Sequence, residues 1–304
     1  MSFGIGKSVS HCGARRSVIG HRICIMIIFA AMDNAFVLLL AGFLIGTMGT
    51  LIGAGGGFLL VPLLLFTHPG MSPELVTAVS LVVVACNAIS GSLAYAKSGR
   101  IDYKAGILFA AATIPGSVLG VFVTKFIPVN AFNVVFGVIL VALAAFLFFK
   151  KRSEAGDAAS TLPSGKRFTH RVLTDRGHVE YRYSYNKYRG MLISVIVGFL
   201  SPLLGIGGGI IHVPALVHWL KFPVYIATAT SHFILAIMAT VSVLVHALQG
   251  NYNDPYILHM IIWLAIGVIP GAQIGAMLSH KVKGDIIVKA LAVCLAIVGL
   301  RLLL

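Results

Sequence analysis

Long apolar stretches dominate the chain, and short polar breaks divide them into segments of similar length. Six of these segments hold 19 to 25 residues each and lie at 75–96, 105–126, 131–149, 224–248, 256–278 and 286–304. A helix needs about 20 predominantly apolar residues to cross the hydrocarbon core of a membrane. The pattern therefore predicts a polytopic membrane protein with three spanning helices in each half of the chain.

Each half begins with an apolar run that glycines interrupt. The first run, residues 35–66, reads GAGGG at 53–57, and the second run, residues 190–220, reads GIGGG at 205–209. As one helix the first run would be roughly 48 Å long, whereas the hydrocarbon core is about 30 Å thick. We therefore expect either a broken span or a re-entrant helical hairpin with the glycines at its tip. Such breaks at matching positions of two halves indicate the binding site of a transporter.

Further motifs recur in the same order in the two halves. Thr-Ala-x-Ser occurs at 77–80 and 228–231, and Ile-Pro-Gly-x-x-x-Gly occurs at 114–120 and 269–275. A series of paired motifs that keeps its order indicates an internal duplication. We therefore predict an all-α membrane fold of two homologous repeats, each with a glycine-broken hairpin followed by three transmembrane helices.

Two segments lie outside the repeats, which span residues 35–149 and 190–304. Residues 1–34 hold four basic residues and an apolar run of nine residues. This run is too short to cross a membrane, so we favour an interfacial extension over a secretory signal. Residues 150–189 hold ten Lys and Arg among Ser, Gly, Asp and Pro and form a soluble linker. Turn residues between short alternating runs at 171–181 predict a small hairpin within it.

The charge content agrees with a membrane protein. Only 11% of the residues are charged, whereas soluble domains average about 25%, and the mean hydropathy is +0.97. The net charge of +14 does not indicate nucleic-acid binding, because the basic residues lie between apolar runs, as in the cytoplasmic loops of membrane proteins. We therefore expect a multi-pass protein of the inner (plasma) membrane, in contact with the lipid bilayer, whose linker 150–189 is cytoplasmic.

The distribution of Lys and Arg from Met32 onwards distinguishes two topologies. If the glycine-broken segments are re-entrant, 17 basic residues lie on the side of the linker and two on the other side. If each segment crosses the membrane, the counts are 14 and five. Because basic residues concentrate on the cytoplasmic side, we favour re-entrant hairpins and inverted repeats, with Asn251 and the C-terminus outside.

The glycine breaks also mark a candidate binding site. A helix begins after each break, at Phe58 and at Ile210, and its first turn presents unpaired N–H groups and the positive end of the helix dipole. Glycines let an anion approach those groups closely. Inverted hairpins would bring the two helix starts together near the membrane midplane and form a site for a small anionic substrate without Lys or Arg. Close helix packing is the alternative interpretation, but packing does not require three consecutive glycines.

Polar residues of the spans complete the candidate site. Ser80 and Ser231 are equivalent in the paired motifs and would donate hydrogen bonds to the anion. Asn87 and Gln273 cannot satisfy an amide alone in lipid, so we expect them to face a cavity. His232 could titrate with the substrate or be a satisfied interior histidine. The predicted substrate-binding residues are Gly55, Gly56, Gly57, Ser80, Asn87, Gly207, Gly208, Gly209, Ser231, His232 and Gln273.

Other chemistries lack their characteristic residues in this sequence. His212 and His218 lie six residues apart and do not share a helix face, so we expect no metal site and no cofactor. The sequence contains no HExxH motif, no Ser-His-Asp set and no pair of carboxylates within a span. These observations argue against an enzyme and against a cation pump that relays protons through carboxylates.

The glycine-rich segments, the Thr-Ala-x-Ser motifs and the paired Ile-Pro-Gly-x-x-x-Gly motifs together resemble the TauE/SafE family of membrane permeases over residues 35–304. The resemblance implies a prokaryotic inner-membrane exporter of sulfite or of a small organosulfonate such as sulfoacetate. The residues independently indicate a small anion as the substrate.

Two alternative functions remain open at this point. A transporter of a metal cation or a neutral sulfur compound is the first; a cation site would need carboxylates or a His/Cys cluster in the spans. An intramembrane enzyme or assembly factor is the second; it would need a nucleophile with a base in reach. Only the neighbours Ser231 and His232 suggest such a pair, and adjacent residues of a helix do not face each other.

Overall fold

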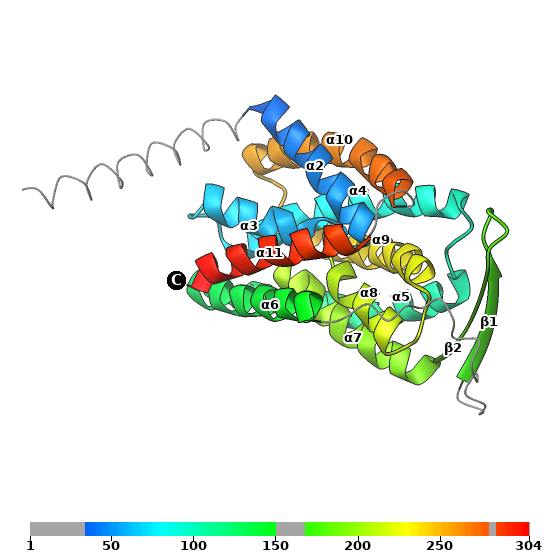
Figure 1. Cartoon of the computed structure of the whole chain (residues 1–304). Coiled ribbons are helices and arrows are strands. Elements are labelled where there is room, and N and C mark those ends of the chain that lie inside the picture. The colour runs from blue at the N-terminus through cyan, green and yellow to red at the C-terminus, as the bar shows by residue number, and fades with distance from the viewer. Residues whose placement is uncertain (1–33, 150–167, 280–283, 304) are drawn as a thin grey trace, which may run out of the picture.

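The protein folds as a bundle of helices with one small β-hairpin at an end (Figure 1). The computed structural model describes residues 34–149, 168–279 and 284–303. The N-terminal extension up to residue 33 and the linker from residue 150 to 167 therefore lie outside the described residues. Among the described residues, seven helices are long and apolar enough to cross a membrane. The predicted class, a helical polytopic membrane protein, is confirmed.

The described residues of the first half, 34–149, form five helices, which are α2 Ala35–Ile52, α3 Gly57–Thr67, α4 Pro73–Lys97, α5 Tyr103–Thr124 and α6 Val129–Phe149. Polar side chains set three of the helix starts. Asn34, Ser72 and Asp102 accept hydrogen bonds from backbone N–H groups in the first turns of α2, α4 and α5. Such caps satisfy donors that a helix start leaves unpaired. The three predicted spans of this half agree with α4, α5 and α6 within two residues at each end.

The second half has the same order of elements, which are α7 Lys187–Leu204, α8 Gly209–His218, α9 Val224–Leu248, α10 Pro255–Leu278 and α11 Gly284–Leu303. In each half a helix of 18 residues is followed by a short helix and then by one of 25 residues. The helices of spanning length among the described residues are α2, α4, α5, α6, α7, α9 and α10. α3 and α8, with 11 and 10 residues, are too short to cross.

The two halves pack against each other through equivalent pairs of helices. α2 packs along α10 and α7 along α5, while α4 packs against α9 and α6 against α11. If each helix is replaced by its equivalent in the other half, the α2–α10 pair becomes the α7–α5 pair, while the α4–α9 and α6–α11 pairs stay the same. Glycines permit the closest approaches, since a Cβ on Gly46 would lie 2.6 Å from the Val268 carbonyl oxygen and one on Gly116 2.5 Å from that of Val195. Small residues at such interfaces allow close helix packing in membranes.

The outer face of α2 shows how the bundle meets lipid. Phe36, Leu40, Leu44 and Met48 recur at every fourth position and are exposed, and this spacing places them on one face of the helix. Gly42, on another face, is buried against the backbone of α10. A helix with one apolar exposed face and one packed face is typical of the rim of a membrane bundle.

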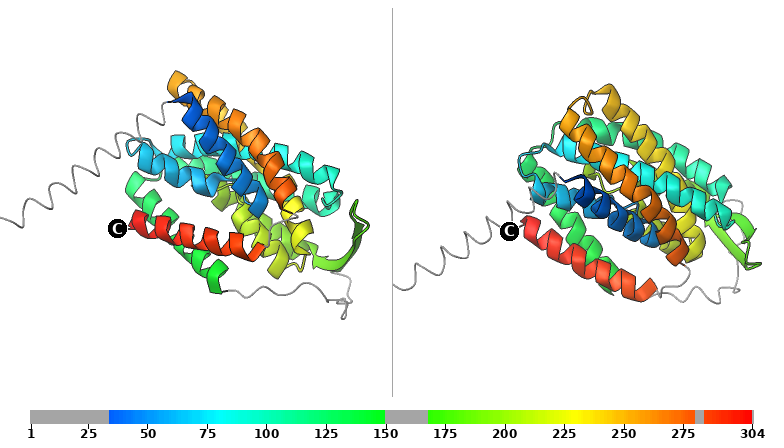
Figure 2. Two further views of the ribbon diagram at one scale, coloured as in Figure 1. Left: turned by 45° about the horizontal axis from the view of Figure 1, so that its top comes forward. Right: turned by 90° about the horizontal axis from the view of Figure 1, so that it is seen from above.

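The two ends of the bundle can be assigned from α4, whose 25 residues extend about 37 Å. At its start Glu74 accepts a hydrogen bond from Asn251, and just beyond its end Arg100 forms an ion pair with Asp175. Asn251 and the β-hairpin therefore lie at opposite ends. α3 runs back towards the end at which α2 begins, and the C-terminus lies far from the hairpin (Figures 1 and 2).

A single cysteine at position 251 should react with an impermeant thiol reagent only from outside the cell, in a background that lacks the native cysteines. The 17-to-2 distribution of basic residues predicts that the opposite, hairpin-bearing end is cytoplasmic. A cysteine at position 178, in the turn of the hairpin, is the matched control and should react only from the cytoplasm. Labelling of position 251 from the cytoplasmic side alone would contradict the inverted topology and favour four crossings in each half.

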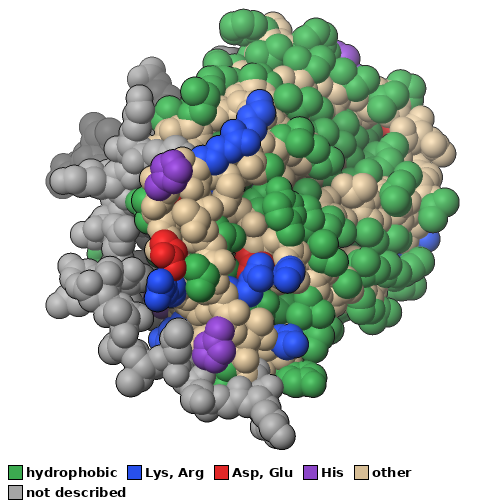
Figure 3. All heavy atoms as spheres, turned by 90° about the vertical axis from the view of Figure 1, so that its right-hand side faces the viewer, with side chains coloured by type: hydrophobic (Ala, Val, Ile, Leu, Met, Phe, Trp, Pro, Cys, Tyr) green, Lys and Arg blue, Asp and Glu red, His purple; other side chains and the backbone are tan. Residues whose placement is uncertain are grey.

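The hairpin predicted within the linker consists of β1 Phe168–Thr174 and β2 Glu180–Asn186, which pair antiparallel. It docks onto the loop between α4 and α5 through Asp102, whose carboxylate is fully buried. That carboxylate accepts hydrogen bonds from Arg171 at 2.7 and 3.1 Å and from the Tyr183 hydroxyl at 2.6 Å. Burial alone would raise the pKa of the Asp102 carboxyl, but these hydrogen bonds hold the pKa below its ordinary value. In Figure 3, Lys and Arg side chains gather at this end of the molecule.

Asp102→Ala should therefore destabilise the protein. Loss of one partner of a fully buried ion pair costs about 3–5 kcal/mol, and we expect about 2 kcal/mol here, because the Arg171 side chain is 22% exposed. Since the pKa of the carboxyl is lowered, the stabilisation is complete at neutral pH and is lost as the pH falls through the lowered value. Thermal unfolding in detergent measures the change. Glu180→Gln, in an exposed pair with Arg182, is the control, and equal Tm values for the two variants would contradict the docking role.

Candidate functional site

The two glycine breaks form turns with the same backbone conformation. Gly53 caps the end of α2 and Gly56 precedes the start of α3, and their φ angles are 87° and 86°. The equivalent residues of the second break, Gly205 and Gly208, have φ angles of 67° and 61°. These angles lie in the left-handed region, which glycine adopts without the strain of a Cβ atom. The glycines thus end one helix and allow a second helix to start within a few residues.

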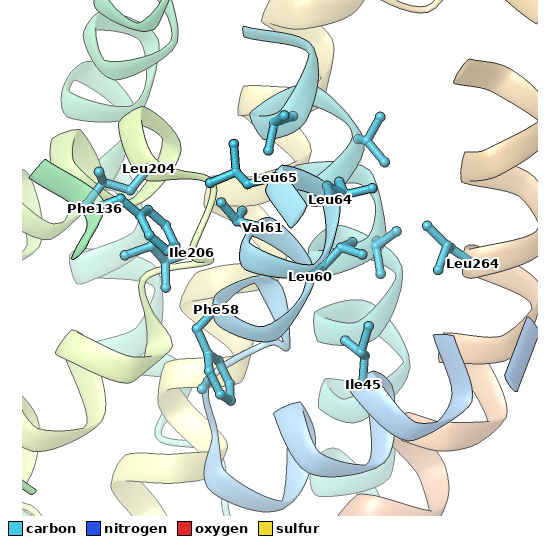
Figure 4. Packing of buried hydrophobic residues seen from close by; sticks show 14 of the residues in the cluster. Ile45, Phe58, Leu60, Val61, Leu64, Leu65, Phe136, Leu204, Ile206 and Leu264 are labelled. Atoms are coloured by element: carbon cyan, nitrogen blue, oxygen red, sulfur yellow. The ribbon is translucent and has the colours of Figure 1, made fainter. Parts of the chain in front are cut away.

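The two turns lie against each other in the buried interior. Gly57, at the start of α3, faces the backbone carbonyl of Gly205, and Gly209, at the start of α8, faces that of Gly53. Apolar side chains of α2, α3, α6 and α7 lie around this region, together with Ile206 of the second turn (Figure 4). The starts of α3 and α8 are therefore neighbours, in agreement with the sequence-based expectation that the two helix starts come together.

Several backbone N–H groups of these turns have no acceptor among the described residues. Two of the predicted donors are used within the turns themselves, because Gly55 donates to the carbonyl of Gly49 and Gly209 donates to that of Gly207. The unpaired donors in the described part of the turns are Gly56, Gly57, Phe58, Gly207, Gly208 and Ile210. Unpaired N–H groups at a helix start attract negative charge, since the helix dipole adds to their partial charges.

Asn87 is the predicted side chain that the structure brings to the start of α3. It is fully buried, and its amide oxygen accepts a hydrogen bond of 2.7 Å from the Thr50 hydroxyl. Its amide nitrogen has no partner among the described residues. That nitrogen and the backbone nitrogen of Gly56 both lie beside Gly49, where a Cβ would be 2.9 Å from the Asn87 nitrogen. A side-chain donor and a helix start therefore converge on one point.

The two predicted serines differ in what their hydroxyl groups do. Ser80 donates a hydrogen bond of 2.7 Å to the carbonyl of Gly205, so its proton supports the glycine turn at the end of α7. Ser231 is fully buried, and its hydroxyl has no partner within the described ranges. Of this pair, only Ser231 has a hydroxyl proton free to reach a substrate.

His232 is connected to the Asn87 region by two intermediate residues. Its ring is fully buried and contacts the ring of Tyr95 edge-on, with the centroids 5.4 Å apart. Neither ring nitrogen has a partner in the part of the chain that the structure describes. The Tyr95 hydroxyl donates to the carbonyl of Thr50, which is the residue that orients Asn87. His232 thus lies on the hairpin side of Asn87 and outside the contacts of the glycine turns.

Gln273 bridges two helices. Its amide nitrogen donates to the backbone oxygen of Ser90 at 2.7 Å and to the Ser90 hydroxyl at 2.9 Å. The Ser90 hydroxyl donates in turn to the carbonyl of Ile269. These contacts join α10 to α4 and satisfy the amide nitrogen inside the bundle, so a cavity is not required to explain a polar residue at this position.

Ser201 is a candidate that the sequence patterns did not single out. It lies on α7, four residues before Gly205, and is fully buried with no hydrogen-bond partner for its hydroxyl among the described residues. A Cβ on Gly208 would lie 2.9 Å from its oxygen. An alignment of the two glycine breaks could have identified Ser201, because Ser201 and Gly49 each lie four residues before the first glycine of their break. Gly49 lines the first turn.

The turns present hydrogen-bond donors without a charged side chain. The closest neighbours of the turn glycines among the described residues are backbone atoms and the side chains of Asn, Ser, Thr, Met and aliphatic residues. Within the same described residues, no group of three His, Cys, Asp or Glu side chains could hold a metal ion. Donors that converge in a dry interior suit an anion with several acceptor oxygens. Dipoles in place of fixed cations bind such an ion weakly enough to release it.

The chain is similar to proteins of one family along both of its halves. Residues 38–302 match the family described as sulfite exporter TauE/SafE. YunE of Bacillus subtilis, a probable membrane transporter protein, is 32% identical over 278 residues, which cover 88% of this chain and 96% of that protein. A probable membrane transporter protein of Methanocaldococcus jannaschii is 30% identical over 278 residues, covering 88% and 94%. No solved structure matches the chain.

Proposed function

Because the chain belongs to the TauE/SafE family of membrane transporters, we propose that it exports a small sulfur-containing anion, such as sulfite or an organosulfonate, across the inner membrane. The family description supports a sulfur oxyanion as the substrate. The relatives are named membrane transporters, which agrees with the prediction that the chain is not an enzyme.

The observation that carries this proposal is the convergence of Asn87 and the start of α3. The Asn87 amide nitrogen is buried without a partner among the described residues, and Gly56, Gly57 and Phe58 present backbone N–H groups without acceptors in the same region. Buried polar groups are normally hydrogen-bonded, so the unsatisfied Asn87 amide and Gly56 N–H, which both lie beside Gly49, call for an acceptor. An oxyanion supplies several acceptor oxygens and the negative charge that a helix start favours.

A cation or a neutral substrate is a weaker fit to the same residues. A cation would need several carboxylate or carbonyl oxygens directed at it. The start of α3 does face the carbonyl of Gly205, but that oxygen already accepts a hydrogen bond from Ser80, and the unpaired groups there are N–H donors. A neutral sulfur compound carries no net charge, so it would gain less from the positive end of the helix dipole than an anion does. The donors at the start of α8 have the same character as those of α3, so both glycine turns favour an anion.

Gly56→Val should abolish binding of radiolabelled sulfite to the purified protein. A Cβ at this position would lie 2.7 Å from the Ile45 side chain and 3.0 Å from the Ile45 carbonyl oxygen, and the φ angle of 86° adds strain for any residue with a Cβ. The turn that presents the N–H groups would therefore have to shift. Size-exclusion chromatography and Tm must therefore show that the protein is folded. Gly70→Val, at a loop position with no atom within 4 Å of an added Cβ, is the matched control. Normal sulfite binding by folded Gly56→Val protein would contradict the proposed site.

A further inference from the structure

The two helix starts are equivalent in the repeats but receive their side-chain donors from different helices. At α3 the donor is Asn87 on α4, seven residues after Ser80, and the equivalent residue at α8 is Met238, seven residues after Ser231. At α8 the hydroxyl comes from Ser201 on α7, and its equivalent beside α3 is Gly49. At α3 the polar neighbour is therefore on α4 and the non-polar one on α2. At α8 the polar neighbour is on α7 and the non-polar one on α9.

The Ser201 hydroxyl is unusual for a serine within a helix. Such a hydroxyl normally donates to the carbonyl four residues earlier, as Ser194 does to Gly190 at 2.8 Å and Ser242 does to Met238 at 3.0 Å. The Ser201 hydroxyl makes no hydrogen bond among the described residues although the residue is fully buried. Its hydroxyl therefore lies unused at the N-terminus of α8.

The Ser201 oxygen also lies where the free N–H groups of α8 begin. A Cβ on Gly208 would be 2.9 Å from this oxygen and 3.3 Å from the Met238 methyl carbon. Gly207, Gly208 and Ile210 have N–H groups without acceptors in the described part of the chain. An uncommitted buried hydroxyl and a helix start therefore meet at α8, as an uncommitted amide and a helix start meet at α3.

The two meeting points are displaced towards opposite ends of the bundle. Tyr95 lies close to the end of α4 that bears the hairpin. Asn87 lies eight residues before Tyr95, or about 12 Å along α4. Met238 lies eight residues before His246 on α9, and His246 contacts Asn251 at the other end. An ion crossing the protein would therefore meet them one after the other.

We propose that the start of α8 is a second anion subsite, formed by the Ser201 hydroxyl and the N–H groups of Gly207, Gly208 and Ile210, which receives the oxyanion from the Asn87 subsite. This inference rests on the proposed function and adds a second binding site along the transport path. Each subsite thus has one side-chain donor, the Asn87 amide in the first and the Ser201 hydroxyl in the second. The anion would pass between the subsite near the hairpin end and the subsite near the Asn251 end, and the membrane potential favours its exit.

Two substitutions test the second subsite in opposite directions. Ser201→Ala removes one hydrogen bond to a charged ligand and should lower the rate of sulfite efflux from proteoliposomes about 10-fold, with sulfite binding at the Asn87 subsite within about twofold of wild type. Met238→Asn adds an amide at the second subsite and should tighten sulfite binding about 10-fold while it slows efflux. Ser242→Ala, a buried serine bonded to its own helix, is the control and should match wild type in both assays.

The outcomes separate failure of this inference from failure of the proposed function. If Ser201→Ala and Met238→Asn both behave like Ser242→Ala while Asn87→Asp loses sulfite binding, the second subsite is wrong and the first one stands. If Asn87→Asp also binds sulfite normally, the proposed function itself is contradicted. Loss of sulfite binding in Ser201→Ala at an unchanged Tm would overturn the two-subsite path in favour of one shared site.

Discussion

Asn87→Asp is expected to eliminate measurable sulfite binding at neutral pH while the protein stays folded. Asp has the shape of Asn and can still accept the hydrogen bond that Thr50 donates to Oδ1, but it replaces the free amide donor by a negative oxygen. Two unit charges about 4 Å apart repel by about 4 kcal/mol at an effective dielectric constant of 20, which corresponds to about a thousandfold in affinity. Equilibrium binding of radiolabelled sulfite, together with Tm on the same preparation, measures both parts of the prediction.

Two further variants separate repulsion from simple loss of a donor. Asn87→Leu removes the donor without adding charge and should weaken sulfite binding about 10-fold or more. Gln273→Leu removes another amide of the bundle, one whose nitrogen is bonded to Ser90, and should lower Tm while sulfite affinity per folded protein stays the same. Wild-type affinity in Asn87→Asp, or equal loss of affinity in Gln273→Leu, would remove Asn87 from the site.

Efflux of a singly charged alkanesulfonate should depend steeply on the membrane potential. An inside-negative potential of 100 mV favours the exit of a single negative charge by about 2.3 kcal/mol. At equilibrium this energy corresponds to an outside concentration of the ion about 50-fold above its inside concentration. The proposed site contains dipoles and no fixed cation, so it moves the full charge of the ion. Proteoliposomes with an imposed potassium diffusion potential and the same pH on both sides provide the measurement.

A proton that travels with the anion would remove this dependence. His232 is the candidate carrier, because its ring is buried beside Tyr95 and both ring nitrogens are without partners among the described residues. Efflux that ignores the potential in the wild type but follows it in His232→Gln would assign the proton to this residue. Efflux that ignores the potential in both proteins would refute the electrogenic mechanism and leave His232 a structural residue.

The helices and the turns could be predicted from sequence because their causes are local. Apolar length alone placed α9 at its observed bounds, 224–248. The glycine runs indicated the breaks at Gly53 and Gly205, since only glycine adopts a left-handed conformation there without strain. The sequence also indicated a hairpin near residues 171–181, because turn residues separate two short alternating runs. None of these features depends on which distant helices meet.

The roles of the polar side chains could not be predicted in the same way, because they depend on contacts between distant segments. Ser80 and Ser231 looked equivalent, but Ser80 lies against the carbonyl of Gly205, 125 residues away. Gln273 finds its partner on α4, 183 residues away. Docking of the hairpin on Asp102 likewise required the pairing of residues 69 positions apart.

Counterflow of radiolabelled anions into proteoliposomes decides whether this chain carries a sulfur oxyanion through the glycine turns. Vesicles loaded with unlabelled sulfite, with an organosulfonate such as sulfoacetate, with a divalent metal cation or with neutral thiourea are compared for wild type and Asn87→Asp. We predict that wild-type protein exchanges sulfite or the sulfonate and neither of the other two, and that Asn87→Asp exchanges none of them. Exchange of the cation or of thiourea in preference to the anions, or undiminished anion exchange by folded Asn87→Asp protein, would contradict the proposed function.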